Sequence, residues 1–187
     1  NGEYTTTTDA ALRDIDNDGF VETVIHNDRL FGVIEGTGGR LTHLFVRGPD
    51  YDDTAIGVDN AYWADTDADF NDVNHVAAFS EVSPAYQHSG YLTAIGLDGN
   101  TVSVTMGHQE VTKTVSLTEG DTFFDVTYRV GPATHWIQGG FSPSLVDLVW
   151  KGQLDRIWAP DASYMGFRNP NTGVTAAWVL GTGGGSH

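Results

Sequence analysis

The sequence contains no cysteine and only two lysines, Lys113 and Lys151. Without cysteine, no disulfide can cross-link the fold, and both thiol catalysis and zinc–thiolate sites are excluded. No apolar run approaches the roughly 18 residues of a membrane span, and no secretory signal pattern is present. The chain begins at Asn1, which we interpret as the start of a processed or excised piece.

Positive charge is also scarce, because 9 Lys and Arg stand against 25 Asp and Glu and give a formal net charge of −16. Such a field repels nucleic acids and anionic membranes, so neither is an expected partner. Two origins of the acidity remain open, and both can hold. One is a halophilic surface whose self-repulsion is screened by salt, and the other is a secreted protein partly neutralised by calcium. We expect an extracellular or cell-surface location, in a halophile.

Helical periodicity is nearly absent, and alternation of apolar and polar residues dominates the 187 residues. About eight or nine antiparallel strands at regular spacing predict an all-β antiparallel sandwich in one domain, residues 1–180. The Gly-rich residues 181–187 are expected to form a flexible tail or linker. One short helix is predicted at residues 143–152. The predicted strands span residues 20–26, 29–35, 40–47, 91–97, 101–106, 111–117, 122–130 and 174–180.

An acidic loop near the start of the chain has the spacing Asp-x-Asp-x-Asp-Gly-x-x-Glu. Calcium binds oxygen ligands only, and a tight loop with alternating carboxylates can surround it. Gly19 suits the sharp turn because a residue without a Cβ accepts unusual backbone angles. The alternative is an acidic turn without an ion. The residues predicted to bind Ca²⁺ are Asp14, Asp16, Asp18, Phe20 through its carbonyl, and Glu22.

The loop is not an EF-hand, because position twelve, where an EF-hand has its closing glutamate, is Ile25. The spacing is similar to the shortened calcium loops of integrin-type (FG-GAP) repeats, which close at position nine and continue directly into a strand. The apolar alternation over 20–26 is typical of such a strand.

A wider resemblance follows from the order of the acidic loop, the Asn27-Asp28 turn and the Gly38-Gly39 turn before Leu41–Leu44. This order resembles the opening of galactose-mutarotase-like super-sandwich domains. The chain is similar to the β-domains that follow the catalytic barrel of family 57 and related α-glucan-active glycoside hydrolases. Residues 140–148 and 166–173 fit the same resemblance. It implies a carbohydrate-handling protein in which this domain is an accessory to a neighbouring catalytic domain.

Carbohydrate binding needs exposed aromatic rings for the apolar face of a sugar, with polar groups beside them. Trp63, Trp136 and Trp158 lie among polar residues in segments that look irregular, and they are the candidate carbohydrate-binding residues. Their alternative role is to cap the open edges of the sandwich. Trp178 alternates with its neighbours in a predicted strand, which favours a core position.

No catalytic residues are assigned, because no nucleophile elbow, phosphate loop, zinc motif or dinucleotide motif is present. The preferred function is a calcium-stabilised, non-catalytic carbohydrate-associated module of a larger glucan-active protein. One alternative is an aldose-epimerase-like enzyme, which would need a histidine and a carboxylate to converge on a sugar. Glu81 with His75, and Glu110 with His108, are the candidate pairs. The other alternative is a structural domain of a cell surface or filament.

Overall fold

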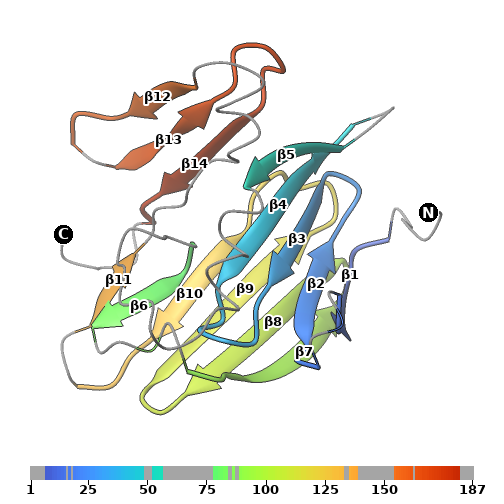
Figure 1. Cartoon of the computed structure of the whole chain (residues 1–187), viewed down its shortest axis with the longest axis vertical. Coiled ribbons are helices and arrows are strands. Elements are labelled where there is room, and N and C mark those ends of the chain that lie inside the picture. The colour runs from blue at the N-terminus through green and yellow to red at the C-terminus, as the bar shows by residue number, and fades with distance from the viewer. Residues whose placement is uncertain are drawn as a thin grey trace.

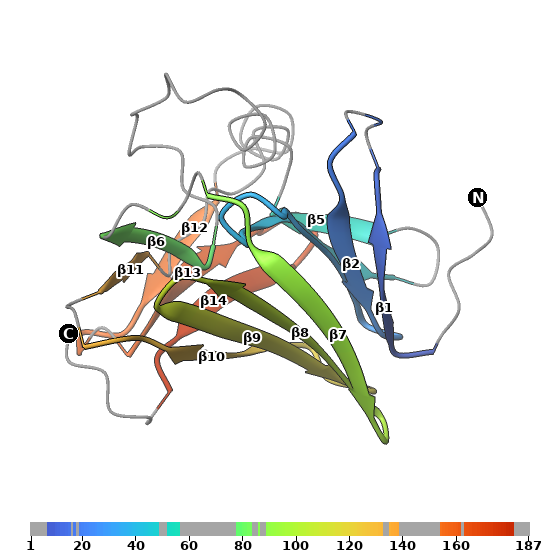
Figure 2. The same cartoon turned by 90° about the horizontal axis from the view of Figure 1, so that it is seen from below.

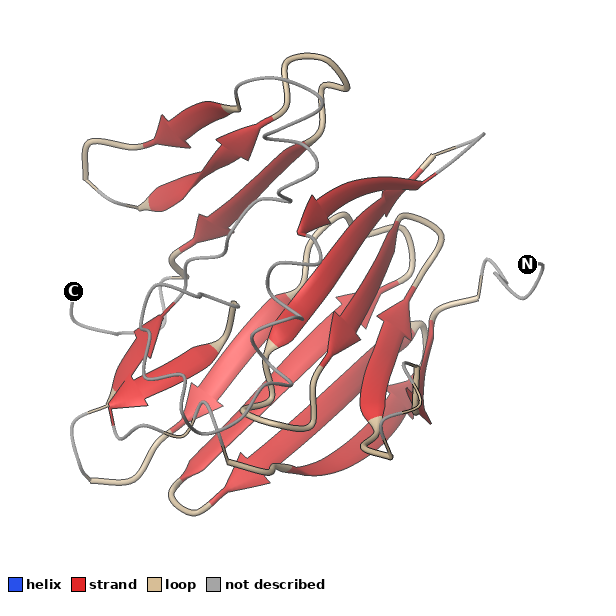
Figure 3. Ribbon diagram, viewed as in Figure 1, coloured by secondary structure: helices blue, strands red, loops and turns tan. Residues whose placement is uncertain are grey.

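The computed structural model describes residues 7–15, 17, 19–48, 52–56, 78–83, 86, 89–132, 135–138, 154–161 and 163–181. Within these ranges the protein contains fourteen strands in four antiparallel sheets and no helix (Figures 1 and 3). The predicted all-β antiparallel sandwich is therefore confirmed.

The sandwich consists of two sheets that pack face to face (Figure 2). The first sheet has the strand order β1-β2-β3-β4-β5, and the second has the order β10-β9-β8-β7. The first comprises β1 (Asp9–Arg13), β2 (Glu22–His26), β3 (Leu30–Ile34), β4 (Leu41–Arg47) and β5 (Asp52–Ile56). The second comprises β7 (Leu92–Asp98), β8 (Thr101–His108), β9 (Val111–Thr118) and β10 (Asp125–Arg129).

Strict alternation in β8 and β9 forms the second sheet's half of the core. Every second residue from Val102 to Met106 and from Val111 to Leu117 is at most 1% exposed, and the core that they form includes Ile25 and Ile34 of the first sheet. On the outer face, three pairs of hydroxyl groups from Thr or Ser lie 2.8–3.1 Å apart across the two strands. The buried set in β8 and β9 is Val102, Val104, Met106, Val111, Lys113, Val115 and Leu117.

Lys113 of β9 is the exception in this core, because it is a lysine with 0% exposure. Its Nζ donates hydrogen bonds to the carbonyl of Gly38 at 2.7 Å and to that of Phe79 at 2.6 Å. The ammonium also lies 4.7 Å from the ring centroid of Tyr91. A buried cation is tolerated only where polar partners replace its water. Lys113 therefore connects the second sheet to the turn that precedes β4.

Gly39 shows how closely the turn fits around this lysine. Its φ is +52°, and a Cβ at this position would lie 2.7 Å from Lys113 Cε. Only glycine satisfies both the left-handed backbone and the close approach. The Gly-Gly turn predicted from sequence is thus a turn between β3 and β4, and it also forms part of the lysine's surroundings.

At the opposite end of the sandwich, Asn27 joins the two sheets. Its side chain is 0% exposed and donates to the carbonyls of Thr118 at 2.7 Å and Asp121 at 2.9 Å. Its Oδ1 accepts the backbone N–H of Leu30 at 2.7 Å, which shapes the β2–β3 turn. This one side chain fixes the β2–β3 turn against the turn between β9 and β10.

Two smaller sheets lie beside the sandwich (Figure 1). The first pairs β6 (Ser80–Ser83) with β11 (Trp136–Gln138). The second, which we name the C-terminal sheet, contains β12 (Asp155–Trp158), β13 (Tyr164–Arg168) and β14 (Thr175–Val179). Its last strand, β14, contacts β5 of the first sheet.

The strand count predicted from sequence was too low. Strands β1, β5, β6, β11, β12 and β13 were not predicted, because all of them have five residues or fewer and only a short alternating pattern. The helix predicted at residues 143–152 lies outside the described residues. The remaining predicted strands overlap β2, β3, β4, β7, β8, β9, β10 and β14.

Candidate functional site

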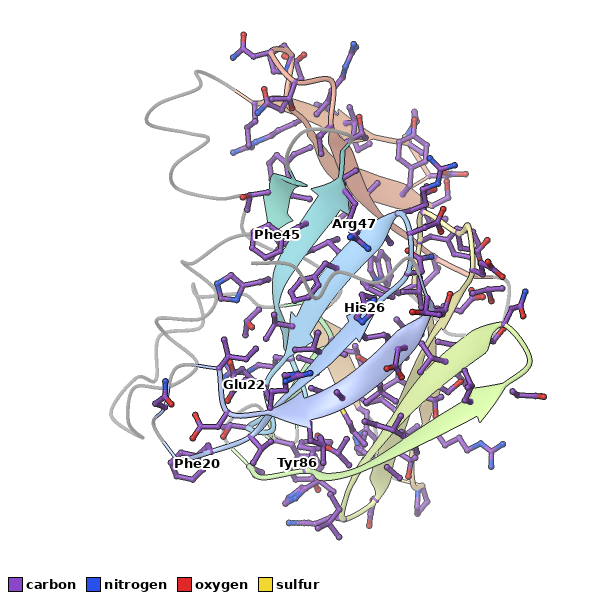
Figure 4. All side chains as sticks on the ribbon, turned by 90° about the vertical axis from the view of Figure 1, so that its right-hand side faces the viewer. Phe20, Glu22, His26, Phe45, Arg47 and Tyr86 are labelled. Atoms are coloured by element: carbon purple, nitrogen blue, oxygen red, sulfur yellow. The ribbon has the colours of Figure 1, made fainter. Side chains whose placement is uncertain are left out.

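The acidic loop connects β1 to β2 at one end of the first sheet. Asp14, Ile15, Asn17, Gly19 and Phe20 of this loop are all exposed. Asn17 has φ of +63° and Gly19 has φ of +92°, so the chain reverses through two left-handed residues. In Figure 4 the ring of Phe20 lies at the outer end of the loop, where it is 71% exposed.

Two carboxylates fold back onto the backbone of this loop. Asp14 Oδ2 accepts the N–H of Gly19 at 3.3 Å, and Glu22 Oε2 accepts the N–H of Ile15 at 2.7 Å. Glu22, the first residue of β2, is only 3% exposed. The first and last predicted ligands therefore close the loop from its two ends.

The predicted calcium ligands are only partly described by the structure. Asp16 and Asp18 lie outside the described residues, while Asp14, Phe20 and Glu22 lie within them. No group of three or more metal-binding side chains occurs among the described residues, a set that leaves out the two central aspartates. Calcium binding at the loop therefore remains a prediction.

The structure describes the three candidate tryptophans to different extents. Trp63 lies outside the described residues, and of Trp136 the structure describes the backbone as the first residue of β11. Trp158, the last residue of β12, is 63% exposed. An exposed indole of this size is the feature that sugar binding requires.

Trp158 belongs to a row of three large side chains across the C-terminal sheet. Its direct cross-strand partner is Met165 of β13, and the partner of Met165 is Trp178 of β14. Directly paired residues of antiparallel strands share one face, so the two indoles flank the methionine on the same side. With strands about 4.8 Å apart, the two tryptophan backbones are separated by roughly 9.5 Å.

The prediction that Trp178 belongs to the core is wrong. Its side chain is partly exposed, and it is not among the described residues that form or line the hydrophobic core. The pattern identified its strand correctly but did not show that the strand belongs to an open sheet. The row itself was missed because β12 and β13 were not predicted. The Pro160-Asp161 turn between them, in which Asp161 Oδ1 accepts the N–H of Ser163 at 3.0 Å, was the available signal.

The C-terminal sheet is electrically neutral, unlike the rest of the chain. Residues 154–181 contain two acidic residues, Asp155 and Asp161, and two basic residues, Arg156 and Arg168. Arg156 precedes Trp158 by two residues in β12, so both lie on the same face. The face therefore combines an exposed indole with a guanidinium that can donate hydrogen bonds.

Histidines and a carboxylate gather at the β8–β9 turn, although not in the predicted pairs. His135 Nε2 lies 3.9 Å from Glu110 Oε2, and the His135 side chain is 1% exposed. Nδ1 of His108, at the end of β8, instead donates a hydrogen bond to the carbonyl oxygen of Gly90, 3.0 Å away. His135 is buried, whereas the side chain of Glu110 is 50% exposed, and the epimerase alternative stays a prediction. His75 lies outside the described residues, and so does the side chain of Glu81.

Two half-buried histidines of the first sheet have lowered pKa values. Burial lowers the pKa of His43. The pKa of His26 is lowered mainly by burial and further by Arg47 and Arg13, while Asp9 opposes the change. Both imidazoles therefore favour the neutral form in the folded protein.

Comparisons of the chain with protein families, with characterised proteins and with solved structures find no match. Among the described residues, no helix is long and apolar enough to span a membrane. The resemblance to galactose-mutarotase-like domains therefore stays a prediction.

Proposed function

We propose that this protein is a non-catalytic carbohydrate-binding module of a larger glucan-active protein, stabilised by calcium. The observation that carries the proposal is the row of Trp158, Met165 and Trp178 on the neutral C-terminal sheet. An uncharged glycan needs no opposite charge in its binding site, and indole rings supply the apolar contact. The −16 charge elsewhere on the chain disfavours anionic partners.

The spacing of the two tryptophans suits a ligand longer than a single sugar. A chain that crosses the strands can contact one indole with one sugar ring and the second indole with a later ring. Met165 lies between them and provides a flexible apolar contact. Arg156 and the nearby backbone supply donors for sugar hydroxyl groups.

Calcium at the acidic loop would be structural. The carboxylates of Asp14, Asp16, Asp18 and Glu22 crowd into nine residues and repel one another unless a cation neutralises them. The closed loop formed by the Asp14–Gly19 and Glu22–Ile15 hydrogen bonds supports this part of the proposal. A bound ion would hold the entry to β2 in place. The acidity supports an extracellular or surface role in a salty environment.

Calorimetric titration with malto-oligosaccharides of increasing length, in millimolar calcium, tests the carbohydrate proposal. We expect binding that strengthens with length, and Trp158→Ala to weaken it about tenfold, which corresponds to about 1.4 kcal/mol. Val179→Ala is the matched control, because Val179 pairs with Tyr164 on the opposite face of the same sheet. Equal binding by the parent, Trp158→Ala and Trp178→Ala would reject the aromatic row as the site. No binding of any glycan would favour a structural surface domain.

A further inference from the structure

The edge of the sandwich formed by β1 and β7 exposes apolar side chains that belong to its interior. Ile95 and Leu97 of β7 pair directly with Val104 and Val102 of β8, which are at most 1% exposed. Paired residues share a face, so Ile95 and Leu97 point inward. Yet Ile95 is 39% and Leu97 66% exposed.

The first sheet repeats this feature at its own edge. Leu12 of β1 lies two residues from Ala10, which is buried and pairs with the fully buried Ile25. Leu12 therefore also points inward by alternation, yet it is 53% exposed. Strand β1 contacts both β7 and β8, so the exposed interior residues of the two sheets lie at one open side (Figure 2).

Strand β7 has none of the usual protection of an edge strand. Natural edge strands carry lysine, proline, a bulge or an inward-pointing charge that prevents pairing with another chain. Strand β7 is seven residues long, pairs with β8 in unbroken register, and has Asp98 as its last residue and sole charge. Its N-terminal neighbours Gly90 and Tyr91 bond to Thr37 and Gly36 of the connection between β3 and β4. From Leu92 onward, no further strand among the described residues pairs with it.

We propose that two copies of this chain join through their β7 strands. Antiparallel pairing about a twofold axis at Ile95 would place Ile95 opposite its counterpart and Leu97 opposite Thr93 of the other copy. The two second sheets would then form one continuous eight-stranded sheet. The added strand would extend the interior face next to β1 and cover Leu12.

The absence of charged residues near β7 permits a second copy to approach at this edge. Residues 82–97 contain no Asp, Glu, Lys or Arg, whereas the whole chain carries −16. Two like-charged molecules can approach most closely where each one lacks charge. The remaining repulsion is long-range and is screened by salt, since the Debye length falls from about 10 Å at 0.1 M to about 3 Å at 1 M. The dimer is therefore favoured at high salt.

Sedimentation analysis of the parent in about 0.1 M and about 1 M potassium chloride tests the interface. We expect a dimer whose fraction rises with salt and protein concentration. Leu97→Lys should shift the protein to monomer, because it places an inward charge at the edge. Val179→Lys is the matched control, since Val179 of β14 is 68% exposed and the charge change is the same. This control should dimerise like the parent.

Hydrogen exchange on the parent gives an independent answer if Leu97→Lys fails to fold. The amides of β7 should become more protected as the protein concentration rises in high salt, because edge N–H groups acquire partners. A monomer at every salt and protein concentration overturns the proposal. A dimer that is disrupted by Val179→Lys but not by Leu97→Lys also overturns the proposal. A dimer whose formation leaves the hydrogen exchange of the β7 amides unchanged overturns it as well.

Discussion

In β8 and β9 of the sandwich the inward residues are at most 1% exposed, whereas in the C-terminal sheet Trp158 is 63% and Val179 68% exposed. Both regions are antiparallel, and exposure alternates with period two in β8, β9 and β14. The difference is that the first sheet covers the inner face of β8 and β9, while the tryptophan row has no comparable cover. Large exposed apolar groups on a stable sheet indicate a surface that binds something.

The two regions also differ in where their charged and apolar side chains lie. The sandwich buries a lysine at one end, where Lys113 bonds to two carbonyl groups. The C-terminal sheet exposes its apolar side chains and has balanced charge. We infer that the sandwich residues serve stability and that the tryptophan row serves binding, and the following predictions test that division.

The largest effect is expected from Lys113→Ala. The change removes the link between the sheets, leaves the carbonyls of Gly38 and Phe79 without this donor, and creates a cavity. Each buried carbonyl left without a donor costs about 1–3 kcal/mol, and the cavity adds to this loss. Denaturant unfolding measures the loss, and Arg129→Ala on the exposed outer face of β10 is the control. A loss under about 1 kcal/mol would show that the lysine is not central to the sandwich.

Calcium should have the next largest effect on the free energy of unfolding, and it should stabilise the sandwich, to which the acidic loop belongs. Stabilisation follows mass action and is about 2.7 kcal/mol at a hundredfold excess of free calcium over the dissociation constant. Thermal melting in millimolar calcium and in chelator measures it. Magnesium should substitute poorly because it requires a tighter octahedron.

The variant Asp16→Ala with Asp18→Ala should lose this calcium response. Asp28→Ala with Asp121→Ala is the matched control, because it removes two aspartates from turns of the sandwich outside the loop. If the loop variant and the parent respond equally, the ion binds elsewhere. If neither responds, the loop is an acidic turn without an ion.

Acid should weaken the sandwich below about pH 6.5, the ordinary pKa of histidine. Because burial lowers the pKa of His43 and of His26, the unfolded chain binds protons more readily than the folded protein. Stability is therefore complete above about pH 6.5 and falls as the pH drops through the folded pKa values. Unfolding free energies at pH 7 and just below 6 should differ less in His26→Gln with His43→Gln. If this difference in unfolding free energy is the same in the double variant as in the parent, groups other than the two histidines cause the loss of stability in acid.

The smallest effect is expected for the stability of Trp158→Ala. An indole that is 63% exposed contributes little to folding, so the unfolding free energy should change by less than about 1 kcal/mol. Val104→Ala, at a position with 0% exposure, should cost several times more. A large loss in Trp158→Ala would mean that the C-terminal sheet is part of the folded core.

The alternation at 101–106 and 111–117 predicted the second sheet and its buried face, because period two decides which residues share a face. The alternation at 174–180 likewise predicted a strand, but it did not reveal whether another layer covers that strand, and so it favoured a core position for Trp178. Lys113 falls on the buried side of the alternation, but its partners at Gly38 and Phe79 are 75 and 34 residues away in sequence. Such long-range contacts have no local signal.

The candidate site was predictable to different degrees. Spacing alone identified the acidic loop, and the structure shows Asp14 and Glu22 closing it. Trp158 is exposed, and its role in carbohydrate binding stays a prediction. The partnership with Met165 and Trp178 depends on the register of two short strands, which five-residue patterns do not determine.

The most direct test of the division between a structural sandwich and a binding sheet is a two-dimensional NMR titration with a malto-oligosaccharide in millimolar calcium. The indole N–H signals of all five tryptophans can be assigned by single replacement with phenylalanine. We predict that the ligand shifts the signals of Trp158 and Trp178 and leaves the backbone amides of Val104 and Lys113 unchanged. Shifts confined to the sandwich, with both indole signals unmoved while the ligand binds, would contradict the account.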